Sequence, residues 1–160
     1  MTLLIKYIQY KNKNLIFMEN INLIRERVKV SGLSKNAKTL VYEVLESSNY
    51  SSQGVERRAL LQNLNAKWTS YIEAQETIQE NLASKAYYEK RLKWSRRTLG
   101  LIKKPAPLQL KPVKEFPATP VPCNENFRNI CFEVFQSGLI ETKTVNGQEH
   151  ICPTAKLIQP

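Results

Sequence analysis

Residues 137–152 read SGLIETKTVNGQEHIC, and they carry the clearest local structural signal in the chain. Two segments that are typical of strands, 140–145 and 148–152, flank the dipeptide Asn146-Gly147. Asn-Gly favours a type I′ turn because both of its residues tolerate positive φ. The sequence therefore predicts a β-hairpin close to the C-terminus.

An apolar helix is predicted directly before this hairpin, beginning near Glu125. Its apolar residues recur at helical spacing and are Phe127, Ile130, Cys131, Val134 and Phe135. This face is more apolar than a DNA-reading helix should be, so we expect it to pack against another part of the fold.

Proline marks the main boundary in the chain. Six of the eight prolines lie between Pro105 and Pro122, and such a stretch favours extended, polyproline-like chain. We expect a linker or strap over 105–122, with a helix and hairpin after it in 123–160. As a strap it would lie against a folded neighbour through its apolar residues, Leu108, Leu110, Val113 and Phe116.

The segment before the prolines, 18–104, is predicted to be a helical basic domain. Apolar residues at three- and four-residue spacing predict an amphipathic helix over 35–47, with Ser34 as its N-cap. A second helix is predicted over 55–64. A third is expected to begin at a capping box at Ser70 and to reach Leu99, either unbroken or with a break near Ala83-Ser84.

The first 17 residues differ from the rest in composition. They are rich in Lys, Asn, Ile and Tyr and contain no acidic residue. We expect 1–17 to be a basic tail that can be disordered. The alternative is that Met1 is an upstream start, that Met18 is the native one, and that the fold does not need this segment.

Composition narrows the class of protein. The 160 residues carry a net charge of +10, and no apolar run approaches the length of about 20 residues that a membrane-spanning helix needs. The chain has no Asp, a single histidine and five scattered glycines. These absences exclude Asp-based metal clusters, a Ser-His-Asp triad and a Gly-rich phosphate loop. We expect a small intracellular protein that is no enzyme, takes no cofactor and binds no membrane.

The positive charge is concentrated near the end of the third helix. Between Lys85 and Lys104 there are eight basic residues and one acid, Glu89. At about 100° per residue, five of the basic residues share an arc of roughly 140° on the helix. These five are predicted to contact phosphates: Lys85, Lys90, Lys93, Arg96 and Arg97.

Two further groups complete the predicted nucleic-acid interface. Arg91, Trp94 and Tyr87 are candidates for contacts to bases or sugars, because aromatic rings can stack on bases. Arg57 and Arg58 are expected to hold the flanking backbone. On the opposite side of the helix, Tyr88, Leu92 and Leu99 are expected to meet a core.

Two helix ends resemble the exit from the recognition helix into the wing of winged helix-turn-helix DNA-binding proteins. Each has a glycine followed by Leu-Ile, at Gly100-Leu101-Ile102 and Gly138-Leu139-Ile140. The resemblance implies a left-handed helix cap at the glycine and a buried strand after it. In the first copy the helices 35–47 and 55–64 precede a recognition helix over 84–98. In the second, the hairpin is the wing and belongs to the same fold as the N-terminal helices.

Four side chains near the C-terminus have the chemistry of metal ligands: Cys123, Cys131, His150 and Cys152. Structural zinc sites usually pair ligands two to four residues apart, and the first two cysteines are too widely spaced for that. We therefore expect free thiols in a reducing compartment and no metal site.

The sequence thus predicts a mainly α protein: a small helical domain with a C-terminal β-hairpin, winged-helix-like, and a Pro-rich strap between. Its predicted function is nucleic-acid binding, DNA in preference to RNA, as a transcription regulator. The alternative is a non-catalytic helical subunit of a larger protein or ribonucleoprotein assembly. As a stand-alone DNA reader the protein would be a monomer or a symmetric homodimer, and as a subunit it would belong to a larger assembly.

Overall fold

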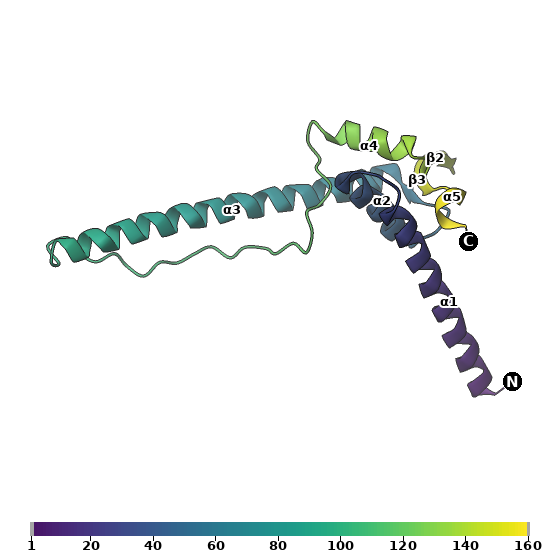
Figure 1. The fold of residues 1–160 in the computed structure, drawn as a ribbon, viewed down its shortest axis with the longest axis horizontal. Helices are drawn as coiled ribbons and strands as arrows, with labels where there is room; N and C mark the ends of the chain where they lie inside the picture. Colours follow the sequence, from purple (N-terminus) through teal and green to yellow (C-terminus); the bar gives the residue numbers. More distant parts are fainter. Residues whose placement is uncertain (1, 160) are drawn as a thin grey trace. The chain divides into compact units, whose positions relative to one another are not determined.

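The computed structural model describes residues 2–159, and these are mainly helical (Figure 1). The elements in chain order are α1 (Leu3–Lys29), α2 (Lys35–Ser47), β1 (Val55–Glu56), α3 (Arg57–Arg97), α4 (Phe127–Gln136), β2 (Ile140–Val145), β3 (Gln148–Pro153) and α5 (Ala155–Ile158). They form two compact units. Unit 1 comprises residues 2–65 and 120–159, and unit 2 comprises 66–119.

Unit 1 is built around one apolar core. Helix α2 supplies five of its buried side chains, and Ser34 caps this helix as predicted, its Oγ accepting a hydrogen bond from the Ala37 amide at 3.3 Å. α1, α4, α5 and the sheet bury their apolar residues against α2 or beside it. The buried cluster is Ile24, Val28, Ala37, Leu40, Val41, Val44, Leu45, Leu60, Leu64, Val121, Ile130, Val134, Leu139, Ile140, Ile151 and Leu157.

The predicted hairpin is confirmed. β2 and β3 pair antiparallel with Val145 opposite Gln148, and the two turn residues between them have positive φ, 51° at Asn146 and 77° at Gly147. β3 also pairs with β1, so the sheet has the order β1-β3-β2. Through β1, the hairpin joins the fold of the N-terminal helices.

Gly54 allows β1 to approach β3 closely. Its φ is +69°, and a Cβ atom at this position would lie 2.1 Å from the carbonyl oxygen of Ile151. An L side chain rarely adopts this φ, and this space cannot hold even a methyl group. The chain therefore needs glycine immediately before β1.

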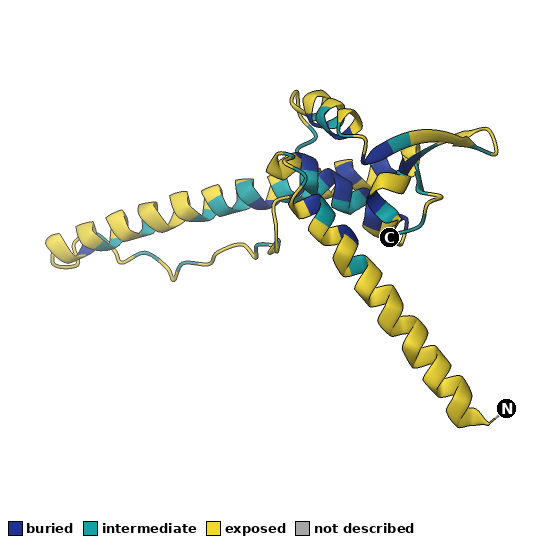
Figure 2. Ribbon diagram, turned by 45° about the vertical axis from the view of Figure 1, so that its right-hand side comes forward, coloured by how far each residue is buried: buried dark blue, intermediate teal, exposed yellow. Residues whose placement is uncertain are grey.

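α1 differs from the basic tail that we expected for residues 1–17. Helix begins at Leu3 and continues without interruption to Lys29. The C-terminal end of α1 is buried in unit 1, whereas its side chains before Ile21 are exposed (Figure 2). The basic composition of this segment is thus compatible with a helix that lacks contacts within the chain.

α3 replaces the two or three helices that we expected between residues 55 and 99. The helix runs continuously from Arg57 to Arg97, so the predicted start at Ser70 is wrong, whereas of the two alternatives beyond Ser70 the unbroken helix is the one observed. The physical reason is that no glycine or proline lies between Gly54 and Gly100, and one continuous helix satisfies more backbone hydrogen bonds than two.

The Pro-rich segment is a strap, as one of our two interpretations predicted. Within unit 2, Asn81 of α3 holds Lys111 by two hydrogen bonds: its Nδ2 donates to the Lys111 carbonyl at 2.9 Å, and its Oδ1 accepts from the Lys111 amide at 3.0 Å. Phe116 of the strap also meets the ring of Tyr71 edge-on, with centroids 5.5 Å apart.

The two Gly-Leu-Ile segments have different structures. After Gly138, Leu139 and Ile140 are buried and Ile140 begins β2, as predicted. After Gly100, Leu101 is 91% exposed and no strand follows before the strap, so the prediction is wrong at the first copy. Leu99 is also exposed and has φ +52°, which takes it away from the core that we expected it to meet.

Candidate nucleic-acid interface

The end of α3 and the segment that follows it carry a row of exposed cations, here called the basic row. All eight of its side chains are exposed, and they are Lys85, Lys90, Arg91, Lys93, Arg96, Arg97, Lys103 and Lys104. None forms a side-chain hydrogen bond or an ion pair with another residue among the described positions 2–159. Because no acid of the chain neutralises them, their charge is available to an external anion. Glu89, the one acid in this stretch, is also exposed.

Some cations elsewhere are paired with acids of the same chain. Arg57 Nη1 lies 2.7 Å from Glu149 Oε2, and Lys143 Nζ lies 2.9 Å from Glu141 Oε1. The hydrogen bond to Glu149 raises the pKa of Arg57, and that to Glu141 raises the pKa of Lys143. These groups already have a counter-charge, which lowers the gain from a phosphate contact.

Two large aromatic side chains accompany the basic row. Trp94 is 53% exposed and Tyr87 is 64% exposed, so both rings can be reached from solvent. Tyr87, Tyr88 and Arg91 line a groove of about 410 Å³ together with the strap residues 105–109. An aromatic ring beside a guanidinium group at a groove suits the face of a base and its neighbouring phosphate.

The other face of this part of α3 is covered. Ser95 is buried, Tyr88 and Leu92 are half-buried, and all three belong to unit 2 together with the strap. Tyr88 and Leu92 are thus partly covered, but the apolar core that they were expected to meet is built from residues of unit 1. The strap gives unit 2 one covered face and leaves the basic row uncovered.

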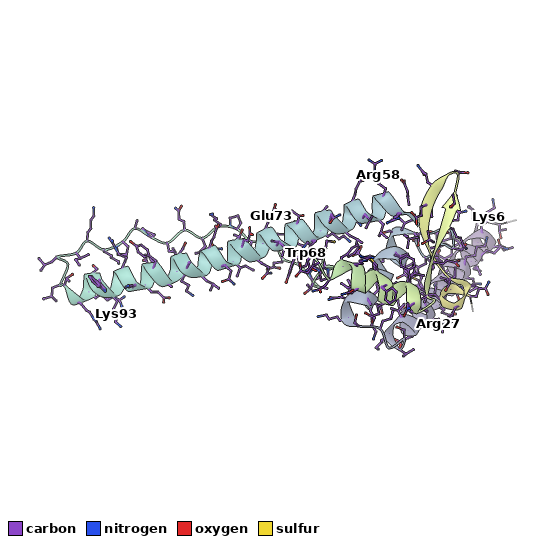
Figure 3. All side chains as sticks on the ribbon, turned by 90° about the horizontal axis from the view of Figure 1, so that it is seen from above. Lys6, Arg27, Arg58, Trp68, Glu73 and Lys93 are labelled. Carbon is purple, nitrogen blue, oxygen red and sulfur yellow. The ribbon has the colours of Figure 1, made fainter. Side chains whose placement is uncertain are left out.

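The structure brings eight of the ten predicted site residues into one unit. Lys85, Tyr87, Lys90, Arg91, Lys93, Trp94, Arg96 and Arg97 belong to unit 2, whereas Arg57 and Arg58 belong to unit 1 (Figure 3 labels Arg58 and Lys93). Arg57 is bound to Glu149, and Arg58 is exposed. Lys103 and Lys104 were missing from the predicted set, although the same charge count would have included them.

α4 offers less charge than the end of α3. Arg128 is its one cation, and its acid, Glu133, accepts hydrogen bonds from the Ser34 amide at 2.6 Å and from Ser34 Oγ at 2.8 Å. Phe132 on the same helix is largely exposed. This balance of charge makes α4 a poorer phosphate-binding surface than the basic row.

The candidate metal ligands do not form a site. Within residues 2–159, no group of three or more His, Cys, Asp or Glu side chains is placed to hold a metal ion. Burial raises the pKa of all three thiols, so they are protonated at neutral pH. Cys152 is fully buried, and its Sγ donates to the Gln53 carbonyl at 3.3 Å.

Two further findings concern membrane-spanning helices and similarity to known proteins. In the described part of the chain, no helix has both the length and the apolar character to cross a membrane. Comparison with protein-family models, curated proteins and solved structures found no match to this chain. The function of this protein is therefore inferred from the chemistry of its side chains.

Proposed function

We propose that this protein is a non-catalytic nucleic-acid-binding protein that contacts phosphates through the basic row. The observation that carries the proposal is that eight exposed cations lie together without one acid partner within the described chain. Lysine and arginine side chains in such a row displace condensed counterions from a phosphate backbone, and this release drives binding.

The side chains have different proposed roles. Lys85, Lys90, Lys93, Arg96 and Arg97 share one arc of α3 and contact successive phosphates. Tyr87, Arg91 and Trp94 lie beside that arc and contact bases or sugars, because stacking on an exposed ring needs no particular base sequence. Arg58 contacts flanking backbone. Arg57 can do so only if it leaves Glu149.

We propose DNA in preference to RNA, and a role in transcription regulation. This part of the proposal is supported by the resemblance to winged helix-turn-helix proteins. In unit 1, α4 ends at Gln136, and after Gly138 the Leu139-Ile140 pair leads directly into the hairpin that would be the wing. This contact would be additional to that of the basic row, which belongs to unit 2. The inference from a resemblance of this kind to DNA is one of analogy.

The test measures binding by fluorescence anisotropy at several salt concentrations. Replacing Arg96 and Arg97 by Ala together should weaken DNA binding and reduce the slope of log K against log salt by roughly one to two. Lys111→Ala is the control, because it removes a cation of the same unit that is already paired with Glu80. An unchanged slope in the double variant would exclude these two arginines from the interface.

The choice of nucleic acid is tested with three ligands of equal length. Duplex DNA should bind more tightly than single-stranded DNA or RNA at the same salt concentration. If a single strand binds most tightly, the exposed rings of Tyr87 and Trp94 become the principal contacts. If no form binds at low salt, the proposal fails.

A second candidate function is that of a helical subunit in a larger assembly. The observation that favours it is the set of exposed apolar side chains in the first half of α1, which includes Leu3, Ile8, Leu15 and Phe17. Exposed apolar surface of this kind marks a protein interface. Binding of nucleic acid and assembly through α1 use different surfaces and are compatible.

A further inference from the structure

A groove lies between the end of α3 and the start of the strap, and both of its walls belong to unit 2. α3 contributes Ser84, Tyr87, Tyr88 and Arg91 to its lining, and the strap, which lies alongside α3 in Figures 1 and 3, contributes residues 105–109. Its volume of about 410 Å³ is within the range of about 300–1,000 Å³ that is usual for pockets that hold small ligands. A group of the size of a nucleobase therefore fits.

The lining of this groove suits both the face and the edge of a base. The ring of Tyr87 is 64% exposed, and Pro105 and Leu108 form an apolar wall on the side of the strap. Ser84 and Gln109 are exposed, and no other residue in the described part of the chain forms a hydrogen bond with either side chain. Because a hydroxyl and an amide can each donate and accept, they can bond to the polar edge of a base that lies on Tyr87.

Tyr87 and Trp94 form an aromatic stripe between the groove and the phosphate-binding arc of α3. At about 100° and 1.5 Å per residue, their side chains point within about 20° of each other and are about 10.5 Å apart along the helix. Arg91, which lines the groove, lies about 40° from Tyr87 on one side, and Lys90, at the edge of the arc, lies about 60° from it on the other. A strand whose phosphates follow the arc therefore places its bases over the rings and towards the groove.

The groove selects against paired bases. In a duplex each base is stacked between its neighbours and presents only its edges to a protein, so its face cannot lie on Tyr87. A base of a single strand has a free face, and stacking on an aromatic ring tolerates any base sequence. The occupant that this geometry favours is thus an unpaired base.

We propose that the groove binds an unpaired base of a DNA strand that continues into a duplex, as in a single-stranded tail at a duplex end. This inference rests on the proposed function, because the basic row has to hold the phosphates. The residues of α3 that line the groove end at Arg91, whereas the basic row continues to Lys104. The cations beyond the groove remain for the duplex, and they are Lys93, Arg96, Arg97, Lys103 and Lys104.

Fluorescence anisotropy of the full chain tests this inference with three DNAs: a blunt duplex, the same duplex with a short tail, and the same duplex with a tail of abasic nucleotides. The two tails carry equal numbers of phosphates, and each is measured on either strand. The tail that has bases should bind on the order of tenfold more tightly than the abasic tail, which corresponds to one stacked base. Equal binding of both tails, with salt-dependent binding of the blunt duplex, would overturn this inference and leave the proposed function standing. Absence of binding to every DNA would overturn both.

Variants of one exposed tyrosine then locate the contact. Tyr87→Ala should remove the difference between the two tails, because the ring supplies the stacking face, and Tyr87→Trp should keep it. Tyr10→Ala is the matched control, because Tyr10 is 67% exposed but lies in unit 1, and it should keep the full difference. Circular dichroism checks that each variant retains its helix content. A difference between the tails that survives Tyr87→Ala would exclude the groove as the site.

Discussion

Unit 1 and unit 2 are stabilised in different ways. Unit 1 encloses a cluster of buried apolar side chains from five helices and the sheet. In the described residues of unit 2, Ala74 is the one buried hydrophobic side chain, and the strap is held to α3 largely by polar and aromatic contacts. Burial of apolar surface is the main source of stability in proteins, so unit 1 carries the folding free energy.

The two units also differ in whether their cations have acid partners within the chain. In unit 1, cations such as Arg57 and Lys143 are neutralised by acids of the chain. In unit 2, the basic row remains without such partners. A unit that does not have to bury a core can present one face to solvent over many residues. The surface proposed for nucleic acid thus lies apart from the residues on which folding depends.

The largest expected effect comes from opening a cavity in the core of unit 1. Leu45 is fully buried, and Leu45→Ala should lower the free energy of unfolding by about 2–5 kcal/mol. Leu92→Ala in unit 2, where the side chain is half-buried, should cost about 1 kcal/mol or less. Urea unfolding followed by circular dichroism measures both. Equal losses would show that the two units share one core.

The next effect tests the close approach of β1 to β3. Gly54→Ala forces a Cβ atom against the backbone of β3 at a positive φ, and we expect a loss of about 2 kcal/mol or more. Gly138→Ala has a similar φ of +72° but open space around the new atom, and should cost only about 1 kcal/mol. Thermal unfolding of both variants separates the clash from the strain of the backbone.

A smaller effect is expected for the strap of unit 2. Asn81→Ala removes both hydrogen bonds to Lys111, which lie at an exposed site, and should cost about 1 kcal/mol. Trypsin should then cleave after Lys114 faster than in the wild type, with the urea midpoint of unit 1 unchanged; the bond after Lys111 precedes Pro112 and resists trypsin. Gln79→Ala, on an exposed position of the same helix, is the control and should leave the cleavage rate unaltered.

The smallest effect concerns the link between α4 and the start of α2. Two hydrogen bonds from Ser34 lower the pKa of Glu133 below its ordinary value near 4.5. This interaction therefore stabilises unit 1 above about pH 4.5 and is lost as the pH falls through the lowered pKa.

The corresponding measurement compares melting temperatures at pH 7 and pH 3. Glu133→Gln should melt below the wild type at pH 7, and this difference should shrink towards pH 3, as the pH falls through the lowered pKa of Glu133 and the wild-type carboxylate takes up a proton. Glu125→Gln, at an exposed glutamate before α4, should match the wild type at both values. A constant difference for Glu133→Gln across the range would refute a role for its charge.

Several elements could be predicted because their signals are local. The turn at Asn146-Gly147, the Ser34 cap and the apolar spacing of α2 depend on neighbouring residues, and the structure confirms all three. The exposure of the basic row also followed from its composition, since a dense group of like charges cannot be buried. Each of these predictions needed only the conformational or solvation preference of a short segment.

Other features required the tertiary structure. The sequence by itself determined that helices, a strap and a hairpin exist, and that positive charge gathers near Lys93. Only the fold decided that β1 joins the hairpin, that Gly138 and not Gly100 leads into a strand, and that Arg57 is neutralised by Glu149. It also decided that Ile24 and Val28 of α1 are buried, whereas the described side chains before Ile21 are exposed. The reason is that pairing and burial depend on residues far apart in the chain, whereas local preference is the same for both Gly-Leu-Ile segments.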